Sequence, residues 1–109
     1  MVFEGYDYDF TEIAEADIDE TLSYIEDDLA NPDAAVTFAD ALENKLEEIC
    51  KNPKTGRPVE NPFLKRDDVR RFLVDNYIAY YIIDDKNAKI VVLRVVYGKR
   101  DQDKILRDF

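Results

Sequence analysis

The spacing of apolar residues changes once along this chain, and the change restricts the fold to one class. From residue 12 to residue 51 the apolar side chains recur every three or four positions, as they do on one face of an α-helix. From residue 69 to residue 97 they alternate with polar residues or follow one another without interruption, as they do in β-strands. A helical half followed by a strand half is typical of α+β proteins.

Two helices are expected in the first half. Thr11 is a suitable N-cap for a helix over roughly residues 12–29, and Asn31-Pro32 is a suitable start for a second one that ends at Asn52-Pro53. So short a connection predicts an antiparallel helical hairpin. Its apolar positions are Ala14, Ile18, Leu22, Ile25 and Leu29 in the first helix and Ala35, Phe38, Leu42, Leu46 and Ile49 in the second.

Four strands are expected around and after the hairpin. Residues 6–10 alternate in polarity, and further strands are predicted over residues 69–74, 77–83 and 90–97. The proline-containing stretch 53–68 has the composition of a loop. The apolar run at 90–97 predicts a central strand that is covered on both faces. In the C-terminal tail, Ile105 and Leu106 are expected to pack back onto the body of the protein.

The predicted architecture is therefore a two-layer α+β domain of order β-α-α-β-β-β that spans residues 1–109. The helical hairpin packs on one face of a small antiparallel sheet, and the other face stays partly open.

The net charge of −10 conceals two halves of opposite sign. Residues 1–49 hold one basic and sixteen acidic residues, which gives −15, and residues 50–109 hold fourteen basic and nine acidic residues, which gives +5. The basic half is where we expect an anionic partner to bind. The alternative is that both charge patterns belong only to solvated faces.

Other classes of protein do not fit the composition. No run of eighteen apolar residues suggests a membrane span, and no secretory signal is expected, so the cytoplasm is the expected compartment. The single cysteine, Cys50, has no second cysteine for a disulfide, and the chain contains no histidine. We therefore expect neither a metal nor a cofactor.

Four local strings carry a resemblance to a known family. They are Ala16 to Ile25, Asn52 to Pro58, Val69 to Tyr81 and Arg94 to Asp101. In this order and at these spacings, over about residues 6–107, they resemble the RelE/ParE toxins of bacterial type II toxin–antitoxin systems. The resemblance implies a cognate antitoxin, encoded beside the toxin, that blocks the toxin's active surface. Some members of the family cut messenger RNA in the ribosome, and others poison DNA gyrase and have no known catalytic residues.

A ribonuclease that works without metal needs proton-transferring groups and cations for the phosphate. Guanidinium groups suit the phosphate, and Tyr97, which stands where many relatives carry histidine, could donate a proton. Arg100 matches the family's Gly-Lys-Arg string, here Gly98 to Arg100. The candidate catalytic residues are Arg70, Arg71, Arg94, Tyr97 and Arg100.

Each candidate also has a purely structural interpretation. Arg94 shares strand parity with Ile90, Val92 and Val96, so it would be a structural residue if a helix carboxylate paired with it. Arg70 and Arg71 point to opposite faces, so at most one of them faces a given site. Tyr97 is alternatively a wall of the core. Three further tyrosines are predicted to pack within the sheet, and the alternative is that one of them stacks on a base: Tyr77, Tyr80 and Tyr81.

The sequence departs from the ribonuclease members. Ile78 stands where the best-understood messenger-RNA cutters carry an arginine, and residues 102–106 lack their tyrosine. These departures favour a ParE-like growth inhibitor that acts on gyrase or another protein. The alternatives are a ribosome-dependent endoribonuclease and a degenerate relative that only binds an antitoxin.

The partner and its binding surface follow from the charge pattern. We expect an acidic segment of the antitoxin to lie on the basic sheet, whose uncovered face would gather the arginines. A homodimer and a toxin–antitoxin hetero-oligomer both remain open.

Overall fold

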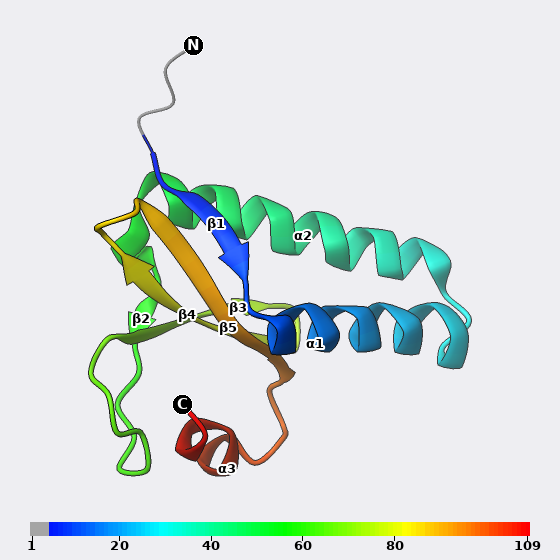
Figure 1. The fold of residues 1–109 in the computed structure, drawn as a ribbon. Coiled ribbons are helices and arrows are strands. Elements are labelled where there is room, and N and C mark those ends of the chain that lie inside the picture. The colour runs from blue at the N-terminus through cyan, green and yellow to red at the C-terminus, as the bar shows by residue number, and fades with distance from the viewer. Residues whose placement is uncertain (1–4) are drawn as a thin grey trace.

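The computed structural model describes residues 5–109 and has an α+β architecture in which helices pack on a five-stranded sheet (Figure 1). The predicted fold class is therefore confirmed. In chain order the elements are β1 (Asp7–Phe10), α1 (Glu12–Ser23), a π-helical turn (Tyr24–Asp28), α2 (Pro32–Lys51), a 3-10 turn (Pro53–Thr55), β2 (Arg57–Pro58), β3 (Val69–Val74), β4 (Tyr77–Asp84), β5 (Lys89–Tyr97) and α3 (Gln102–Arg107).

The helical hairpin begins and ends as the sequence predicts. The Thr11 hydroxyl accepts a hydrogen bond from the backbone N–H of Ala14 at 3.1 Å, and this caps α1. The side-chain oxygen of Asn31 accepts from the N–H of Ala34 at 3.1 Å, and this caps α2. Between the helices Ala30 adopts a left-handed backbone with φ 49°, which reverses the chain in a short connection.

The sheet has the strand order β1-β5-β4-β3-β2 and is mixed. β1 runs parallel to β5, with Asp7 opposite Lys89 and Phe10 opposite Val92, and all other pairs are antiparallel. The expectation of a purely antiparallel sheet is therefore wrong for β1. The alternation of residues in a strand reports which face is buried, but it does not report the direction of the neighbouring strand.

Two short elements were not predicted. β2 pairs with β3 through two residues, Arg57 opposite Arg71 and Pro58 opposite Arg70. Its proline has no N–H to donate, so the segment has the composition of a loop and is tolerated only at a sheet edge. At the C-terminus, Ile105 and Leu106 pack back as predicted, but they do so within the helix α3.

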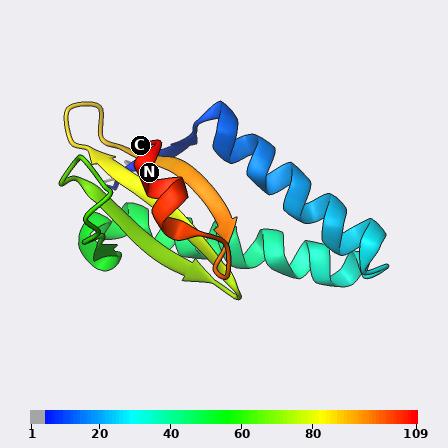
Figure 2. The same cartoon turned by 90° about the horizontal axis from the view of Figure 1, so that it is seen from below.

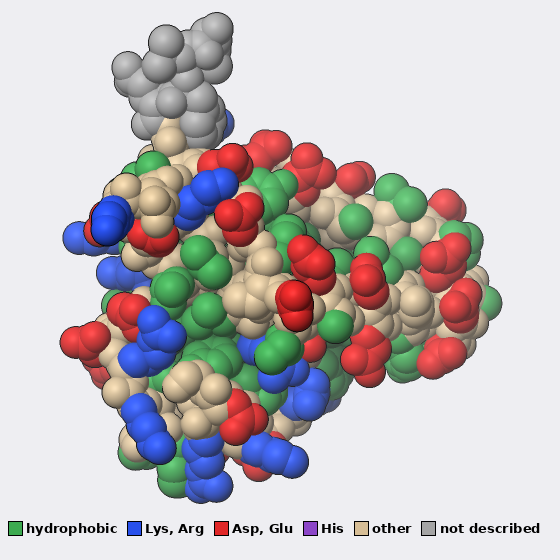
Figure 3. Space-filling view, in the orientation of Figure 1, with side chains coloured by type: hydrophobic (Ala, Val, Ile, Leu, Met, Phe, Trp, Pro, Cys, Tyr) green, Lys and Arg blue, Asp and Glu red, His purple; other side chains and the backbone are tan. Residues whose placement is uncertain are grey.

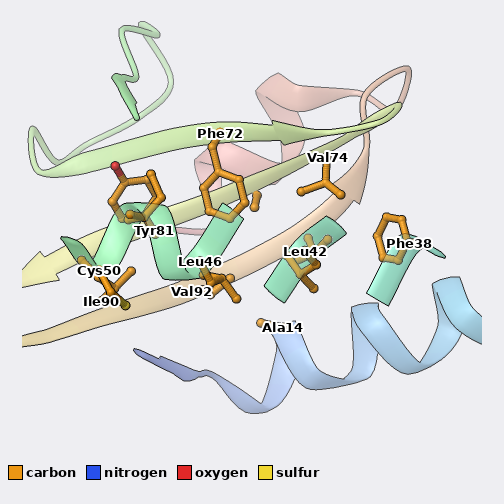
Figure 4. Close-up of a cluster of buried hydrophobic side chains, with 13 residues drawn as sticks. Ala14, Phe38, Leu42, Leu46, Cys50, Phe72, Val74, Tyr81, Ile90 and Val92 are labelled. Atoms are coloured by element: carbon orange, nitrogen blue, oxygen red, sulfur yellow. The ribbon is translucent and has the colours of Figure 1, made fainter. Parts of the chain in front are cut away.

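The main core lies between the sheet and the hairpin (Figure 4). The apolar face of α2 supplies Phe38, Leu42 and Leu46, which are 5% exposed or less, and the sheet faces them with side chains such as Phe72 and Val92. Full burial of side chains of this size contributes about 1.5–3 kcal/mol each. This core fixes the positions of the strand ends on which the candidate residues lie.

A smaller core covers the other face of the sheet, where α3 lies across the strands (Figure 2). Ile105 and Leu106 contact a cluster that includes Tyr80 and Val96, and the cluster is buried. The prediction that β5 is covered on both faces is confirmed. The outer face is consequently less open than the sequence suggested.

The far end of the hairpin extends beyond the sheet, as both ribbon views show (Figures 1 and 2). Ile25 is still half-buried there, but Tyr24 is 48% exposed and Leu29 is 55% exposed. The last turn of the predicted apolar stripe therefore has no strand beneath it.

Candidate functional site

The five residues that the sequence singled out do not converge on one place. Arg94 is bound to the first helix, Arg70 lies on the helix-facing side of the sheet, and Arg71 lies on the opposite side. Tyr97 and Arg100 alone line the same recess. The expectation that the arginines gather on one uncovered face is therefore wrong, and the catalytic role of the five remains a prediction.

Arg94 is held by a carboxylate of α1. Its Nε donates to Oδ2 of Asp17 at 2.7 Å, and its second terminal nitrogen donates to Oδ1 at 3.0 Å. The same carboxylate accepts the backbone N–H of Val95 at 3.0 Å. Asp17 is the one buried charged residue among residues 5–109, and its hydrogen bond raises the pKa of the Arg94 guanidinium. The structural interpretation of Arg94 therefore fits its contacts better than a catalytic one.

The Asp17 contact closes an open sheet edge. β1 covers β5 only as far as Val92, and beyond that point the chain turns into α1. The Thr11 hydroxyl donates to the carbonyl of Leu93 at 2.9 Å, and Asp17 satisfies the next edge N–H. Buried backbone groups at an edge need such partners. Asp17 thus completes the sheet as well as neutralising the arginine.

The predicted parity of β5 fails at Arg94 because the strand contains a bulge. The pairing with β4 shifts there: Tyr80 lies opposite Arg94, whereas Tyr81 lies opposite Val92. One extra residue, Leu93, is accommodated between them, and all later side chains change face. As a result Val95 instead of Val96 continues the face of Val92 toward the hairpin.

Arg70 anchors the chain after α2. It projects on the helix-facing side, and its guanidinium donates to the carbonyl of Gly56 at 2.6 Å and to that of Lys54 at 3.3 Å. Two of its donors are therefore occupied by backbone oxygens. This contact holds β2 against β3.

Arg71 lies on the outer face in the same row as Tyr80, whose ring belongs to the smaller core. Arg57 stands directly opposite it on β2. Both arginines are exposed, and among residues 5–109 neither takes part in an ion pair. The prediction that Arg70 and Arg71 project to opposite faces is confirmed.

Tyr97 and Arg100 lie together at the end of β5. The N–H of Arg100 donates to the carbonyl of Tyr97 at 3.0 Å, in the turn that leads to α3. The ring of Tyr97 packs edge-on against Tyr77 at 5.6 Å between centroids, and the residue is 37% exposed. Tyr97 therefore packs against the core on one side and is exposed to solvent on the other.

These two residues form one side of a groove of about 640 Å³ between the projecting hairpin and the sheet. Most of its lining is apolar or aromatic, and Arg100 is its one basic residue among those described. The lining residues are Tyr24, Ile25, Leu29, Ala34, Phe38, Asp75, Asn76, Tyr77, Tyr97 and Arg100.

The hairpin side of the groove was missed from the sequence. Leu29 belongs to the predicted apolar stripe, and such residues are expected to be buried. Tyr24 lies outside the stripe. Length gave no signal either, because α2, at about 30 Å, is no longer than the nine-residue strand β5.

Charge is divided between the two layers (Figure 3). Acidic side chains cover the hairpin, and basic side chains gather over the sheet, α3 and the loop that precedes β3. The two charged halves of the sequence therefore become two charged regions of the surface.

Within residues 5–109, no three cysteine or acidic side chains come together as a metal site. No helix in this part of the chain is long and apolar enough to cross a bilayer. The arrangement suits binding, because the groove offers a largely apolar and aromatic surface with one guanidinium among the described residues.

The chain matches the family model described as "ParE toxin of type II toxin-antitoxin system, parDE" over residues 8–102. No curated protein sequence matches it significantly. Several solved structures share its fold at low identity.

Three structures illustrate the likeness. A chain of the chromosomal ParDE toxin–antitoxin system of P. aeruginosa is 21% identical with a TM-score of 0.68, over 86% of this chain and 97% of that one. A mutant of the E. coli toxin RelE in the free state is 18% identical with a TM-score of 0.65, over 95% of both chains. A chain of the RelBE2 toxin–antitoxin complex of Mycobacterium tuberculosis is 21% identical with a TM-score of 0.61, over 85% of this chain and 91% of that one.

Proposed function

Because this chain belongs to the ParE toxin family of type II toxin–antitoxin systems, we propose that it arrests growth by binding a protein target, with DNA gyrase as the first candidate, until a cognate antitoxin covers it. The resemblance to RelE/ParE toxins seen in the sequence is confirmed by the family match and the shared fold. The target and the mode of action are the proposal.

One observation carries the choice of binding over catalysis. The candidate catalytic residues are dispersed: Asp17 neutralises Arg94, backbone carbonyls occupy Arg70, and Arg71 lies on the other side of the sheet from Arg70. A phosphodiester-cleaving site needs its cations and its proton-transferring groups within reach of one phosphate. The groove instead presents a largely apolar lining, which is typical of protein interaction sites.

The antitoxin is proposed to occupy this groove. Structures of RelBE and ParDE describe toxin–antitoxin systems, so a protein partner is expected here as well. An amphipathic helix suits an elongated apolar groove, and an acidic residue of that helix would pair with Arg100. The outer sheet face, where the sequence suggested an acidic partner segment, is less suitable because α3 already packs there.

Gyrase inhibition is the direct test of the proposed target. Purified chain added to a supercoiling assay should inhibit gyrase, and stoichiometric antitoxin should restore the activity. Inhibition of translation with supercoiling untouched would contradict the proposal. If expression without the antitoxin gene causes no growth defect, the chain is a degenerate relative that only binds.

The groove can be tested separately with a pair of matched variants. Leu29→Asp places a charge in the groove and should weaken antitoxin binding by about a hundredfold, the effect of losing a central apolar contact. Val36→Asp introduces the same charge on an exposed part of α2 that does not line the groove, and it should bind normally. Equal affinities of the two variants would place the antitoxin elsewhere.

A ribosome-dependent endoribonuclease is the second candidate, and one observation favours it. Tyr97 and Arg100 line one recess, where a phenol and a guanidinium could serve a single phosphate. In that case induced cells should show discrete cuts in translated messages by primer extension. Both Tyr97→Phe and Arg100→Ala should abolish the cuts, and normal cutting by either variant would remove that residue from the mechanism.

A further inference from the structure

A polar site separate from the groove lies at the β2 edge of the sheet. Arg57 on β2 and Arg71 on β3 are directly opposite each other, so their side chains share one face. Like charges in this position destabilise a strand pair. Two opposed guanidinium groups at an edge strand of only two residues therefore require a physical explanation.

Three cations elsewhere on the surface have partners. Arg66 is bound to Asp68, Lys89 lies near Asp7 and Asp9, and the guanidinium of Arg107 stacks on a phenylalanine ring. Within the described part of the chain, Arg57 and Arg71 have no such carboxylate. The positive charge of this pair is therefore uncompensated.

The two arginines are carried by a backbone that is held in place. The N–H of Gly56 donates to the hydroxyl of Tyr81 at 3.0 Å, and this hydroxyl donates in turn to the carbonyl of Pro53 at 2.7 Å. From the same side, Arg70 donates to the carbonyl of Gly56 at 2.6 Å. Positioning of this kind lowers the entropic cost of placing two guanidinium groups around a ligand.

Both arginines line two adjoining cavities. One, of about 300 Å³, lies on the outer face between the start of the β2–β3 loop and α3. The other, of about 440 Å³, follows the edge of β3 and adds Lys45 of α2 to its lining. Either is large enough for a small oxyanion with its water.

We infer that Arg57 and Arg71 form a binding site for a dianionic phosphate group, either free phosphate or the terminal phosphate of a larger molecule. A terminal phosphate carries a charge of about −1.5 to −2 at neutral pH, which matches two guanidinium groups, whereas a carboxylate carries −1. The tetrahedral oxygens can accept from a planar fork on each side, while one fork already saturates a carboxylate. This site does not depend on the proposed toxin function.

One acidic residue limits the affinity. Glu60 lines the outer cavity beside the two arginines, although it forms no ion pair with them in the described part of the chain. Its carboxylate repels a phosphate placed there. Glu60→Gln should therefore tighten phosphate binding, which is the opposite of the effect expected for the arginine variants.

The test titrates the full chain with inorganic phosphate, adenosine 5′-monophosphate and adenosine at constant ionic strength, followed by amide chemical shifts. The first two ligands should shift the amides of Gly56 and Arg71, and adenosine should not. Arg57→Gln and Arg71→Gln should each weaken binding about tenfold. Arg66→Gln is the matched control, because Arg66 is exposed and already paired with Asp68. The affinity of this variant for phosphate should equal that of the parent.

The source of the phosphate is read from the same titration. If adenosine 5′-monophosphate binds more tightly than inorganic phosphate, the site takes the terminal phosphate of a larger molecule. If the two bind equally, the site takes free phosphate. Both results support the site. Affinity should also fall as the pH drops below about 6, because the ligand loses its second charge there.

Two results would overturn the inference. One is phosphate binding that survives in an Arg57→Gln/Arg71→Gln double variant whose thermal unfolding matches the parent. The other is saturation of the same amides by a short glutamate-rich peptide with no response to phosphate, which would identify an acidic protein segment as the ligand.

Discussion

One row of side chains across the sheet has arginines at both ends, and the two ends behave differently. Arg57 and Arg71 lie at the β2–β3 end, Tyr80 lies in the middle, and Arg94 lies on β5. Arg94 is neutralised and largely buried, whereas the pair at the other end is exposed and unpaired among the residues described. The residue type is the same, so the difference comes from the surroundings.

The surroundings differ because the two sheet edges are bordered by different segments. α1 starts where β1 ends and runs beside β5, which brings Asp17 to the edge. At the opposite edge the segment after α2 supplies backbone carbonyls to Arg70, and its acidic residue in the outer cavity, Glu60, forms no ion pair with Arg57 or Arg71 in the described part of the chain. An arginine is therefore structural or available for a ligand according to what its neighbour along the edge provides.

The largest expected effect is at the Arg94 end. Asp17→Ala leaves a buried guanidinium and a buried backbone N–H without their partner, and we expect a loss of about 3 kcal/mol in the free energy of unfolding, measured with denaturant. Asp19→Ala, on an exposed position of the same helix, should change stability by less than about 0.5 kcal/mol. A loss below about 1 kcal/mol for Asp17→Ala would show that the ion pair of Arg94 is no more important for stability than the unpaired arginines at the other end of the row.

The next effect concerns the support of the Arg57 end. A Cβ at position 56 would collide with the hydroxyl of Tyr81 and would lie 2.8 Å from the carbonyl oxygen of Arg71. Gly56→Ala should therefore cost about 2 kcal/mol in unfolding free energy and weaken phosphate binding. Gly98→Ala is the comparison, because its nearest contact, the carbonyl of Asn76, is at 3.0 Å and leaves more room. Equal costs would show that the β2 edge is not tightly held.

The sequence predicts the contacts between residues that are close together along the chain better than those between distant residues. The caps at Thr11 and Asn31, the helical stripe and the three long strands could be predicted, because each depends on residues close together in the sequence. The parallel pairing of β1 could not, because it joins positions about 80 residues apart. A helix carboxylate was foreseen as an alternative partner for Arg94, but its identity as Asp17 was not, because that contact spans a similar distance along the chain. Asp17 lies outside the apolar stripe, so the pattern predicted a solvated side chain.

The candidate site was predicted only in part. Tyr97 and Arg100 line the same groove. Arg94 does not lie on the predicted face of β5, because a continuous apolar run in the sequence does not reveal a β-bulge. Arg57 was overlooked because Pro58 gave its strand the composition of a loop.

A smaller effect separates the backbone support from the charges. Tyr81→Phe removes a hydroxyl that bonds both Pro53 and Gly56, and it should cost about 1–2 kcal/mol in unfolding free energy. Tyr6→Phe removes one exposed hydrogen bond, to Asp85, and should cost about 1 kcal/mol or less while leaving phosphate affinity unchanged, because Tyr6 lines neither cavity. If both variants bind phosphate equally well, the Tyr81 contact does not position Arg57.

The smallest expected effect is that of Arg71→Gln on the free energy of unfolding, and it is not a loss of stability. In phosphate-free buffer Arg71→Gln should be as stable as the parent or more stable by up to about 0.5 kcal/mol, because it relieves the repulsion from Arg57. Arg94→Gln should destabilise by about 2 kcal/mol or more under the same conditions, since Asp17 loses its partner. A loss above about 1 kcal/mol for Arg71→Gln would mean that its charge is compensated after all.

The parallel pairing of β1 with β5 has a consequence for biosynthesis. Residues 7–10 leave the ribosome about 80 residues before their strand partner, which is formed by residues 89–92. Contacts between such distant segments form late, because a long loop must close first. Tyr97 and Arg100 follow that partner strand, so the side of the groove that they supply is absent from a growing chain until residues 97–100 have been made.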